Sequence, residues 1–320
     1  MMTTRFVSVL LPAFWLLLLA AGCRGDAGPE KPDLLPVPER KQWTRAAKAL
    51  EPLHRTKRPP APSDWLAQHE EKGQTFEAYV ASDPVRPDEK RDTLYILLLG
   101  RFSPARKKVV TLTAEFMSIY FGLPVSFADP VPLAEIPARA RRVHPSWGVK
   151  QINASYILEE VLEPRVPDDA VALIAFTASD LWPGPGWNFV FGLASLWKRV
   201  GVWSIHRNGD PAESEEAFAL CLLRTLKTGT HETGHMLGMR HCIAYECNMN
   251  GSNHRAEADS QPLALCPECV RKIWWACGVD PLARYRKLEA FCRRHGLEKE
   301  ADFYAASAGK IAFLDEKKDE

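Results

Sequence analysis

An excess of charge of either sign is what this sequence most clearly lacks. It has 41 Lys and Arg side chains against 40 Asp and Glu, which gives a formal net charge of +1 over 320 residues. No region carries a basic excess, so there is no electrostatic case for a nucleic-acid partner. The sequence also contains no internal repeat. Its ordinary composition, with 46% hydrophobic and 25% charged residues, excludes collagen-like, coiled-coil and wholly disordered chains.

Long apolar runs are equally scarce. Only one stretch approaches membrane-spanning length, and it lies at the N-terminus, so a polytopic membrane protein is excluded. In residues 1–23, Arg5 precedes an apolar core over 6–19, and the small residues 20–22 precede Cys23. This order predicts a lipoprotein-type signal peptide that resembles a bacterial lipobox, with Cys23 as the lipidated residue. The alternatives are an uncleaved anchor and a plain signal peptide followed by a chance cysteine.

The predicted signal peptide implies an exported protein. Lipid chains on Cys23 would hold it on a bacterial membrane, facing the periplasm or the cell exterior. Eight of the 25 prolines fall within residues 24–65, which predicts an extended, Pro-rich tether over 24–89. Helical spacing of apolar residues within 41–53 leaves room for a short helix in that tether. A small pro-segment is the alternative for this range.

From about residue 90, short apolar runs alternate with helical spacings. The run 93–99, ended by Gly100, predicts a buried strand. Further strands are expected at 125–127, 170–176, 187–191 and 200–205, and helices at 109–121, 149–162 and 212–226. Because strands alternate with helices, we expect a layered α/β domain over 90–280 with a largely parallel sheet. Residues 281–320 predict a C-terminal helical extension and a tail.

The most informative segment, HETGHMLGMRH, ends at His241. On a helix, His231 and His235 project from one face, so both imidazoles can reach one metal ion. Gly238 can adopt a positive φ, which lets the chain turn and bring His241 back as a third ligand. Three histidines leave an open coordination position, as catalytic zinc sites do, and Glu232 lies beside it. The alternative is a helix whose histidines are satisfied by ordinary hydrogen bonds.

Four cysteines follow the last histidine in two close pairs, Cys242 with Cys247 and Cys266 with Cys269. Two close pairs of thiolates are the pattern of a closed, tetrahedral structural zinc site. Two disulfides are the alternative, since an exported chain meets oxidant. Because Cys242 directly follows His241, a metal on these cysteines would also fix the last histidine.

The histidine motif is that of the metzincins, and its continuation into the cysteine pairs resembles the archaemetzincin family in particular. The stretches NGSN at 250–253 and WNFVFG at 187–192 also look like that family. The resemblance spans roughly residues 90–275. It implies an α/β, metzincin-like zinc metallopeptidase with a twisted mixed sheet, an active-site helix and a zinc subdomain built on the four cysteines. Met249 matches the Met-turn of the family, an apolar floor beneath the histidines.

The resemblance further implies two zinc ions per chain, one catalytic and one structural, and peptides or proteins as substrates. Zinc would activate a water, and Glu232 would act as the general base that later hands the proton to the leaving amine. If 187–192 is an edge strand above the cleft, an extended peptide could pair with it. The alternative function is a non-catalytic, zinc-bearing peptide-binding or scaffolding lipoprotein on the same fold. The intact Glu232 favours the peptidase.

Overall fold

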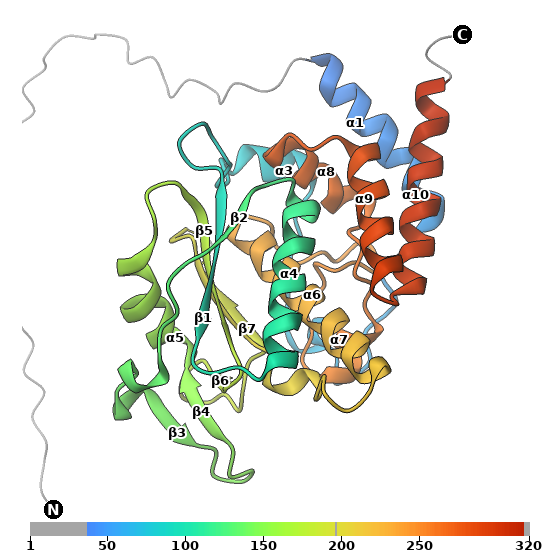
Figure 1. Ribbon diagram of the computed structural model, residues 1–320. Coiled ribbons are helices and arrows are strands. Elements are labelled where there is room, and N and C mark those ends of the chain that lie inside the picture. The colour runs from blue at the N-terminus through green and yellow to red at the C-terminus, as the bar shows by residue number, and fades with distance from the viewer. Residues whose placement is uncertain (1–36, 196, 317–320) are drawn as a thin grey trace, which may run out of the picture. The chain divides into compact units, whose positions relative to one another are not determined.

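A computed structural model describes residues 37–195 and 197–316, which belong to one compact unit, Leu35–Glu320 (Figure 1). The expected signal peptide, the expected lipidation at Cys23 and residues 24–36 of the expected tether lie outside the described residues. Within the described ranges, no helix is both long enough and apolar enough to cross a bilayer.

The central sheet has the strand order β2-β1-β5-β8-β7. Its strands are β1 (Thr93–Leu99), β2 (Val125–Phe127), β5 (Ala170–Thr177), β7 (Gly192–Ala194) and β8 (Val200–Ser204). All pairs are parallel except the last, in which the edge strand β7 runs antiparallel to β8. Every residue of β5 is buried, as expected for a central strand covered on both faces. The prediction of a mixed, largely parallel α/β sheet is confirmed.

Two layers cover the sheet. On one face lie α4 (Pro104–Phe121) and α6 (Glu215–Met236), packed against inward-facing residues such as Ile96 and Ile174 (Figure 1). The other face is covered by a π-helical turn, Ile157–Leu162, packed on residues such as Leu173. Short 3-10 turns complete the connections: Glu51–Leu53, Leu133–Glu135, Ala138–Ala140, Glu163–Arg165 and His206–Asn208.

A second, small sheet corrects the helix predicted over 149–162. It consists of β3 (Arg141–Val143), β4 (Lys150–Asn153) and β6 (Asp180–Trp182), in that order. Gln151 donates to Asp180 in the neighbouring strand, which favours pairing over a helical start. The side chain of Asn153 then accepts from the backbone N–H of Tyr156, and the helical part begins only there, with α5 (Ala154–Tyr156).

The strand predicted over 187–191 is also wrong. Gly184 and Gly186 have positive φ and open a loop, and only Val190 makes a single bridge, to Leu181. The rings of Phe189 and Phe191 lie against the guanidinium groups of Arg207 and Arg255. Alternating aromatic residues thus mark cation–π contacts here rather than a strand. The strand proper is β7, which starts at Gly192.

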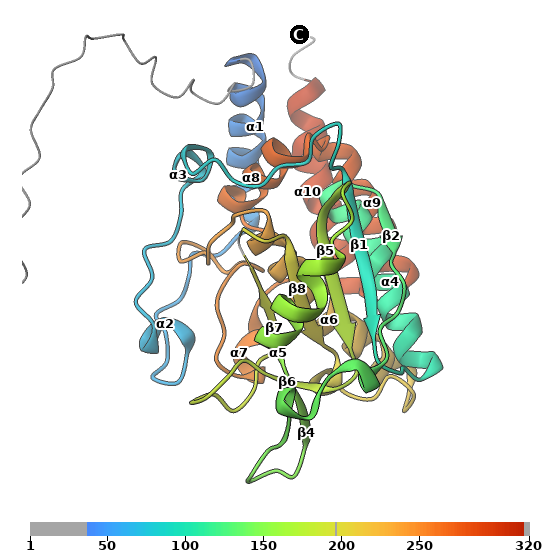
Figure 2. The same ribbon diagram turned by 90° about the vertical axis from the view of Figure 1, so that its left-hand side faces the viewer.

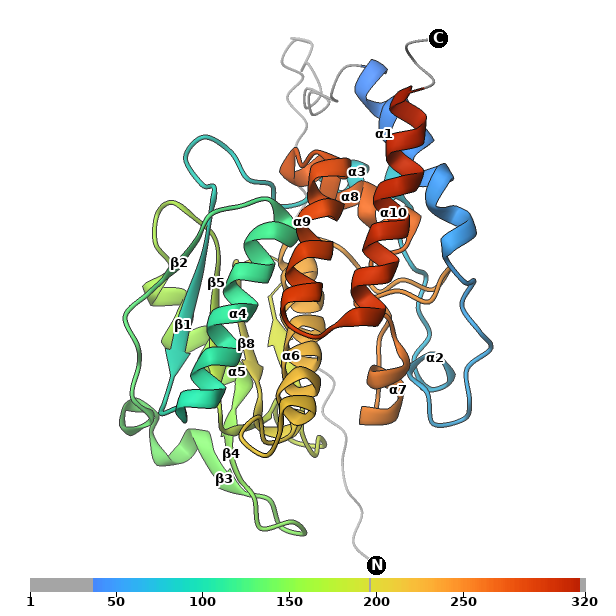
Figure 3. The ribbon, with the colours of Figure 1, turned by 45° about the vertical axis from the view of Figure 1, so that its right-hand side comes forward.

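The described C-terminal part of the chain forms four helices that pack beside the sheet and its covering layers. They are α7 (Arg255–Ser260), α8 (Pro267–Cys277), α9 (Pro281–Arg294) and α10 (Glu298–Glu316). The last two pack against each other, and α9 also contacts α4 (Figure 3). They lie in the stretch for which the sequence predicts a helical extension.

The described part of the expected tether, residues 37–89, differs from an extended spacer. It contains α1 (Val37–Leu50), α2 (Trp65–Gln68) and α3 (Phe76–Ala81). Ala46, Ala47 and Leu50 of α1 are buried in the same core as the sheet, and α1 packs against α8 and α10. Tyr79 of α3 packs edge-on against Trp275 of α8. The apolar spacing that allowed a transient helix therefore forms a helix that is buried along one side.

Candidate metal centre

Helix α6 carries the first two histidines and the glutamate. The Ser214 side chain caps its N-terminus by accepting from the backbone of Ala217, and the helix runs for 22 residues to Met236. Gly238 then takes a φ of +80° and turns the chain back. A side chain at this position would also place its Cβ 2.7 Å from Pro84 Cβ, so glycine is required twice over. The turn returns His241 toward the end of the helix, as the sequence predicts.

The three imidazoles face one another. Nε2 of His231 and Nε2 of His235 are 3.0 Å apart, and the ring of His241 lies 5.3 Å and 4.8 Å from theirs, centroid to centroid. Each Nδ1 is occupied. His231 pairs with the carbonyl oxygen of Asn248 at 2.7 Å, and His235 with that of Met239 at 2.7 Å. His241 Nδ1 lies 2.6 Å from Oε1 of Glu71.

This arrangement fits a metal ion. Carbonyl and carboxylate oxygens only accept hydrogen bonds, so each Nδ1 must carry the proton. Burial lowers the pKa of His231 well below its ordinary value and that of His235 to about 4, so both rings are neutral and their Nε2 atoms carry lone pairs. Two lone pairs 3.0 Å apart repel each other unless a cation lies between them. Neutral imidazole nitrogens are the ligands of catalytic zinc.

Glu232 lies half-buried beside the histidines, in the cleft, and opposite β7. Burial raises the pKa of its carboxyl to about 7, and the nearby His241 opposes that shift. The approach to the strand is close, because a Cβ built on Gly192 would come within 3.2 Å of Glu232 Cγ. The carboxylate is thus held between the helix and the edge strand.

The histidines and Glu232 open into a cleft of about 660 Å³. Its walls come from the loop and edge strand around 186–194, from one face of α6, and from the segment 248–261 that includes α7. Trp65 of α2 closes part of the remaining side. The cleft is large enough for a short stretch of extended peptide.

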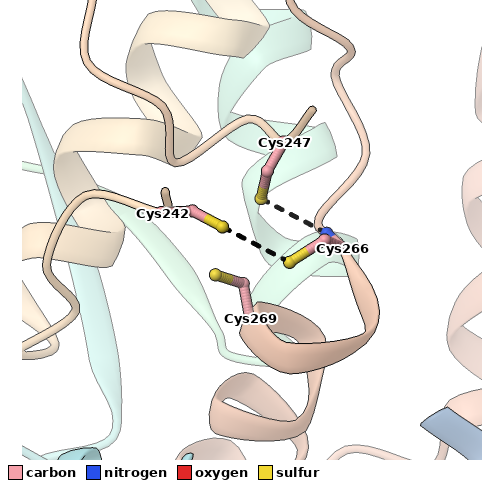
Figure 4. Close-up of side chains that lie close together, drawn as sticks. All are labelled: Cys242, Cys247, Cys266 and Cys269. Atoms are coloured by element: carbon pink, nitrogen blue, oxygen red, sulfur yellow. Dashed lines mark hydrogen bonds between the residues drawn. The ribbon is translucent and has the colours of Figure 1, made fainter. Parts of the chain in front are cut away.

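The four cysteines form a second cluster, with their sulfurs turned toward one another (Figure 4). Sγ of Cys242 and Sγ of Cys266 are 3.6 Å apart. Disulfide bonds are ~2.05 Å long, whereas sulfurs at the corners of a tetrahedron ~2.3 Å from a central zinc lie ~3.8 Å apart. All seven cysteines in the described residues are free thiols. Hydrogen bonds from Cys247, Cys266 and Cys269 hold the pKa of Cys242 well below its ordinary value, so the cluster already favours a thiolate.

Met249 packs against α6 at Gly234. It is fully buried, and a Cβ on Gly234 would come within 2.7 Å of its sulfur. Its carbonyl accepts from the backbone N–H of Cys242 at 2.7 Å. The neighbouring Asn250 donates to the carbonyl of the same cysteine. The loop that carries Met249 is therefore bound to Cys242, the first residue of the cysteine cluster.

Two residues of the site are missed by the sequence analysis. Glu71 contacts the third histidine, and Trp65 both donates to Glu71 through Nε1 at 2.6 Å and stands edge-on to the His241 ring. Both lie in the range expected to be a tether. Nothing in their local sequence marks them, because the contact spans 170 positions.

Comparison with known proteins shows which family this chain belongs to. Residues 147–274 match the model of Peptidase family M54. Archaemetzincin-2 of Pongo abelii is 35% identical over 260 residues, covering 71% of this chain and 71% of that protein. The chain belongs to the archaemetzincin family. Archaemetzincin-2 of Homo sapiens has the same identity and coverage. The crystal structure of archaemetzincin from Methanopyrus kandleri matches 60% of this chain at 25% identity, with a TM-score of 0.47.

Membership settles two of the sequence predictions. The resemblance to archaemetzincins is confirmed, and so is the prediction of an enzyme, since the family is one of zinc metallopeptidases.

Proposed function

We propose that this protein hydrolyses peptide bonds in the cleft beside α6, with one zinc ion held by His231, His235 and His241. The observation that carries the proposal is the convergence of three imidazoles, with ring nitrogens within 4.8 Å of one another, beside the Glu232 carboxyl in the cleft. Zinc bound there would lower the pKa of a water and polarise the carbonyl of the scissile bond. The other steps belong to side chains of this chain.

Glu232 is the proton carrier in this proposal. Its carboxylate would accept a proton from the attacking water and return it to the leaving amine. The position fits because Glu232 follows His231 directly on the helix and lines the cleft beside the imidazoles. The edge strand lies close by, since a Cβ built on Gly192 would come within 3.2 Å of Glu232 Cγ, so β7 bounds the space beside this side chain.

The edge strand β7 is the proposed binding surface for the substrate backbone. Among the residues that the structure describes, β7 pairs with β8 alone in the central sheet, and Gly192, Leu193 and Ala194 all line the cleft. An extended peptide could therefore add to the sheet as a further strand, with its scissile bond near Glu232. A complex in which the peptide lies away from β7 would contradict this part of the proposal.

A second, structural zinc is proposed at Cys242, Cys247, Cys266 and Cys269. The donor set supports it, since four buried thiols converge with a sulfur separation close to a tetrahedral edge. This metal would tie the segment after His241 to the start of α8, and it would contribute directly to the stability of the fold.

The main test compares the protein with Glu232→Gln, measuring zinc per chain by elemental analysis and cleavage of a peptide library. We expect two zinc ions in both proteins, and a rate in the variant lower by about 10²–10⁴, the usual contribution of a general base. One zinc per chain would point to disulfides in the cysteine cluster. Two zinc ions without cleavage by either protein would favour a peptide-binding role.

We also propose that the chain is exported and anchored through a lipid on Cys23. The support is the order of Arg5, apolar core and small residues in the sequence. Expression of the full chain in bacteria with labelled fatty acid tests this. Label in the wild type and none in Cys23→Ala, with release of the variant from the membrane fraction, is the expected result. Label-free wild-type protein in the cytosol would contradict it.

A further inference from the structure

A segment before the central sheet reaches across to the metal centre. We call residues 55–75 the strap. The strap is bound to the segment 245–257, which includes the start of α7, by a bridge from Thr56 to Tyr245 and by an ion pair from Lys57 to Glu246, with Nζ and Oε2 3.1 Å apart. Farther along, the backbone N–H of Trp65 donates to Glu257 at 3.0 Å. Figure 2 shows the strap, with α2, along the side of the molecule near α7.

The end of the strap supplies the partner of the third histidine. Oε1 of Glu71 lies 2.6 Å from Nδ1 of His241 and 2.6 Å from Nε1 of Trp65. The Trp65 ring stands edge-on to the imidazole, with centroids 5.2 Å apart. A Cβ on Gly251 would meet that ring at 2.4 Å, so the indole is tightly enclosed. Trp65 therefore fixes the Glu71 carboxylate, and this carboxylate in turn contacts His241.

The three histidines are not supported alike. His231 and His235 are oriented by neutral carbonyl groups 17 and 4 positions away, in the loop beneath the helix and in the turn that follows it. His241 has no such local partner and depends on a carboxylate 170 positions away. A hydrogen bond to a charged acceptor is about twice as strong as one between neutral groups. A carboxylate on the far nitrogen also makes an imidazole a better metal ligand.

We propose that Glu71 is a positioning residue for the metal centre: it fixes the tautomer and the orientation of His241, and the strap delivers it. The strap lies outside the stretch 147–274 that matches the family model. The third ligand of the site would thus be controlled by a part of the chain beyond that stretch. The inference rests on the proposed metal site at the three histidines.

The test measures the zinc affinity of the histidine site in the full chain by competition with a chromophoric chelator. We expect Glu71→Gln, which keeps an acceptor but removes the charge, to bind zinc about tenfold more weakly. Glu71→Ala, which removes both, should lose up to about a hundredfold, the usual range for such supporting residues. Trp65→Phe keeps an aromatic ring, though a smaller one, but removes the N–H to Glu71, and a loss of a few-fold is expected. The exposed neighbour Glu70, changed to Gln, is the matched control and should bind as wild type does.

A purely structural role for Glu71 would give a different pattern. If Glu71 only fastens the strap, its variants lower the melting temperature but bind zinc within twofold of wild type, and the inference is overturned. Cobalt substitution adds a second readout, since a reoriented His241 changes the visible spectrum of the histidine site. The failure of the proposed function is separate: it would appear as a wild type without metal at the histidines, whatever the Glu71 variants do.

Discussion

Two clusters of candidate ligands lie next to each other along the chain, and they differ in every property that matters for metal chemistry. The histidine cluster is partly exposed, opens into the cleft and offers three imidazole nitrogens. The cysteine cluster is closed, with exposed fractions of 0–6%. It offers four sulfur atoms, and the thiolate form of Cys242 is favoured. An open site can exchange water and substrate, whereas a closed tetrahedral site can only hold its metal. The comparison teaches that burial and the number of ligands, rather than position along the chain, distinguish a catalytic type of metal site from a structural one.

The two clusters are nevertheless joined. Cys242 follows His241 directly, and its N–H donates to the carbonyl of Met249 beneath the helix. The closed cluster therefore holds one end of the open one. If the comparison is right, a substitution in the cysteine cluster should also weaken metal binding at the histidines. Loss of metal from the histidines should leave the cysteine cluster unchanged.

The largest effect is expected for Cys269→Ser, which removes one ligand from the closed cluster. Structural zinc contributes folding free energy directly, so the variant should lose that metal and melt about 10 °C lower or more, with weaker zinc binding at the histidines. Elemental analysis and thermal unfolding measure both. Cys277→Ser, outside both clusters, is the control and should keep two zinc ions. A Cys269→Ser protein with unchanged stability would argue against a structural zinc.

Metal removal should separate the clusters next. An excess of a strong chelator should take the zinc from the open histidine site within minutes, abolishing cleavage while the fold is retained. The second zinc should remain until denaturant exposes the buried thiols. Circular dichroism and zinc release, followed together, measure this. Simultaneous loss of both ions with unfolding would mean that the two sites do not differ as proposed.

A smaller effect is expected for Gly192→Ala in the edge strand. The added methyl would lie 3.2 Å from Glu232 Cγ, so the carboxylate must shift by a few tenths of an ångström. We expect kcat to fall roughly fivefold with both zinc ions retained, since misplacement by ~1 Å costs about 10²-fold. Gly309→Ala on α10, where nothing lies within 4 Å, is the matched control and should leave kcat unchanged.

The smallest effect is expected for Met249→Leu. Leucine has nearly the same volume, so stability should fall by less than about 1.5 kcal/mol, and both metals should stay bound. Met117→Leu, at another fully buried position, should behave alike in thermal unfolding. Loss of zinc from the histidines in Met249→Leu alone would show that the sulfur does more than fill space.

What the sequence predicts well is what depends on neighbours along the chain. His231, Glu232 and His235 share one helical segment, and Gly238 turns the chain because only a local φ is needed. The strand 93–99 is found for the same reason, as a continuous buried run. The helix expected at 149–162 forms only from residue 154 onward, because a partner strand 29 positions away, reached through Gln151 and Asp180, overrides local spacing before that point.

Glu71 shows the limit of such reasoning in the site itself. Its neighbours along the chain are mostly polar, and its role appears only when a segment 170 positions distant arrives. The strand expected at 187–191 fails differently, since its aromatic residues pack on Arg207 and Arg255, whose positions no local pattern reveals.

Assembly of the histidine site requires the strap as well as α6. A contact between distant parts of a chain forms only once the long loop between them has closed, at a cost in conformational entropy. Helix α6 can carry two histidines and a glutamate as soon as it forms, but His241 meets its carboxylate only after the N-terminal segment has docked. A chain caught before that moment holds the motif of a peptidase without a finished site. The connectivity of the fold thus makes a complete metal site depend on docking of the strap.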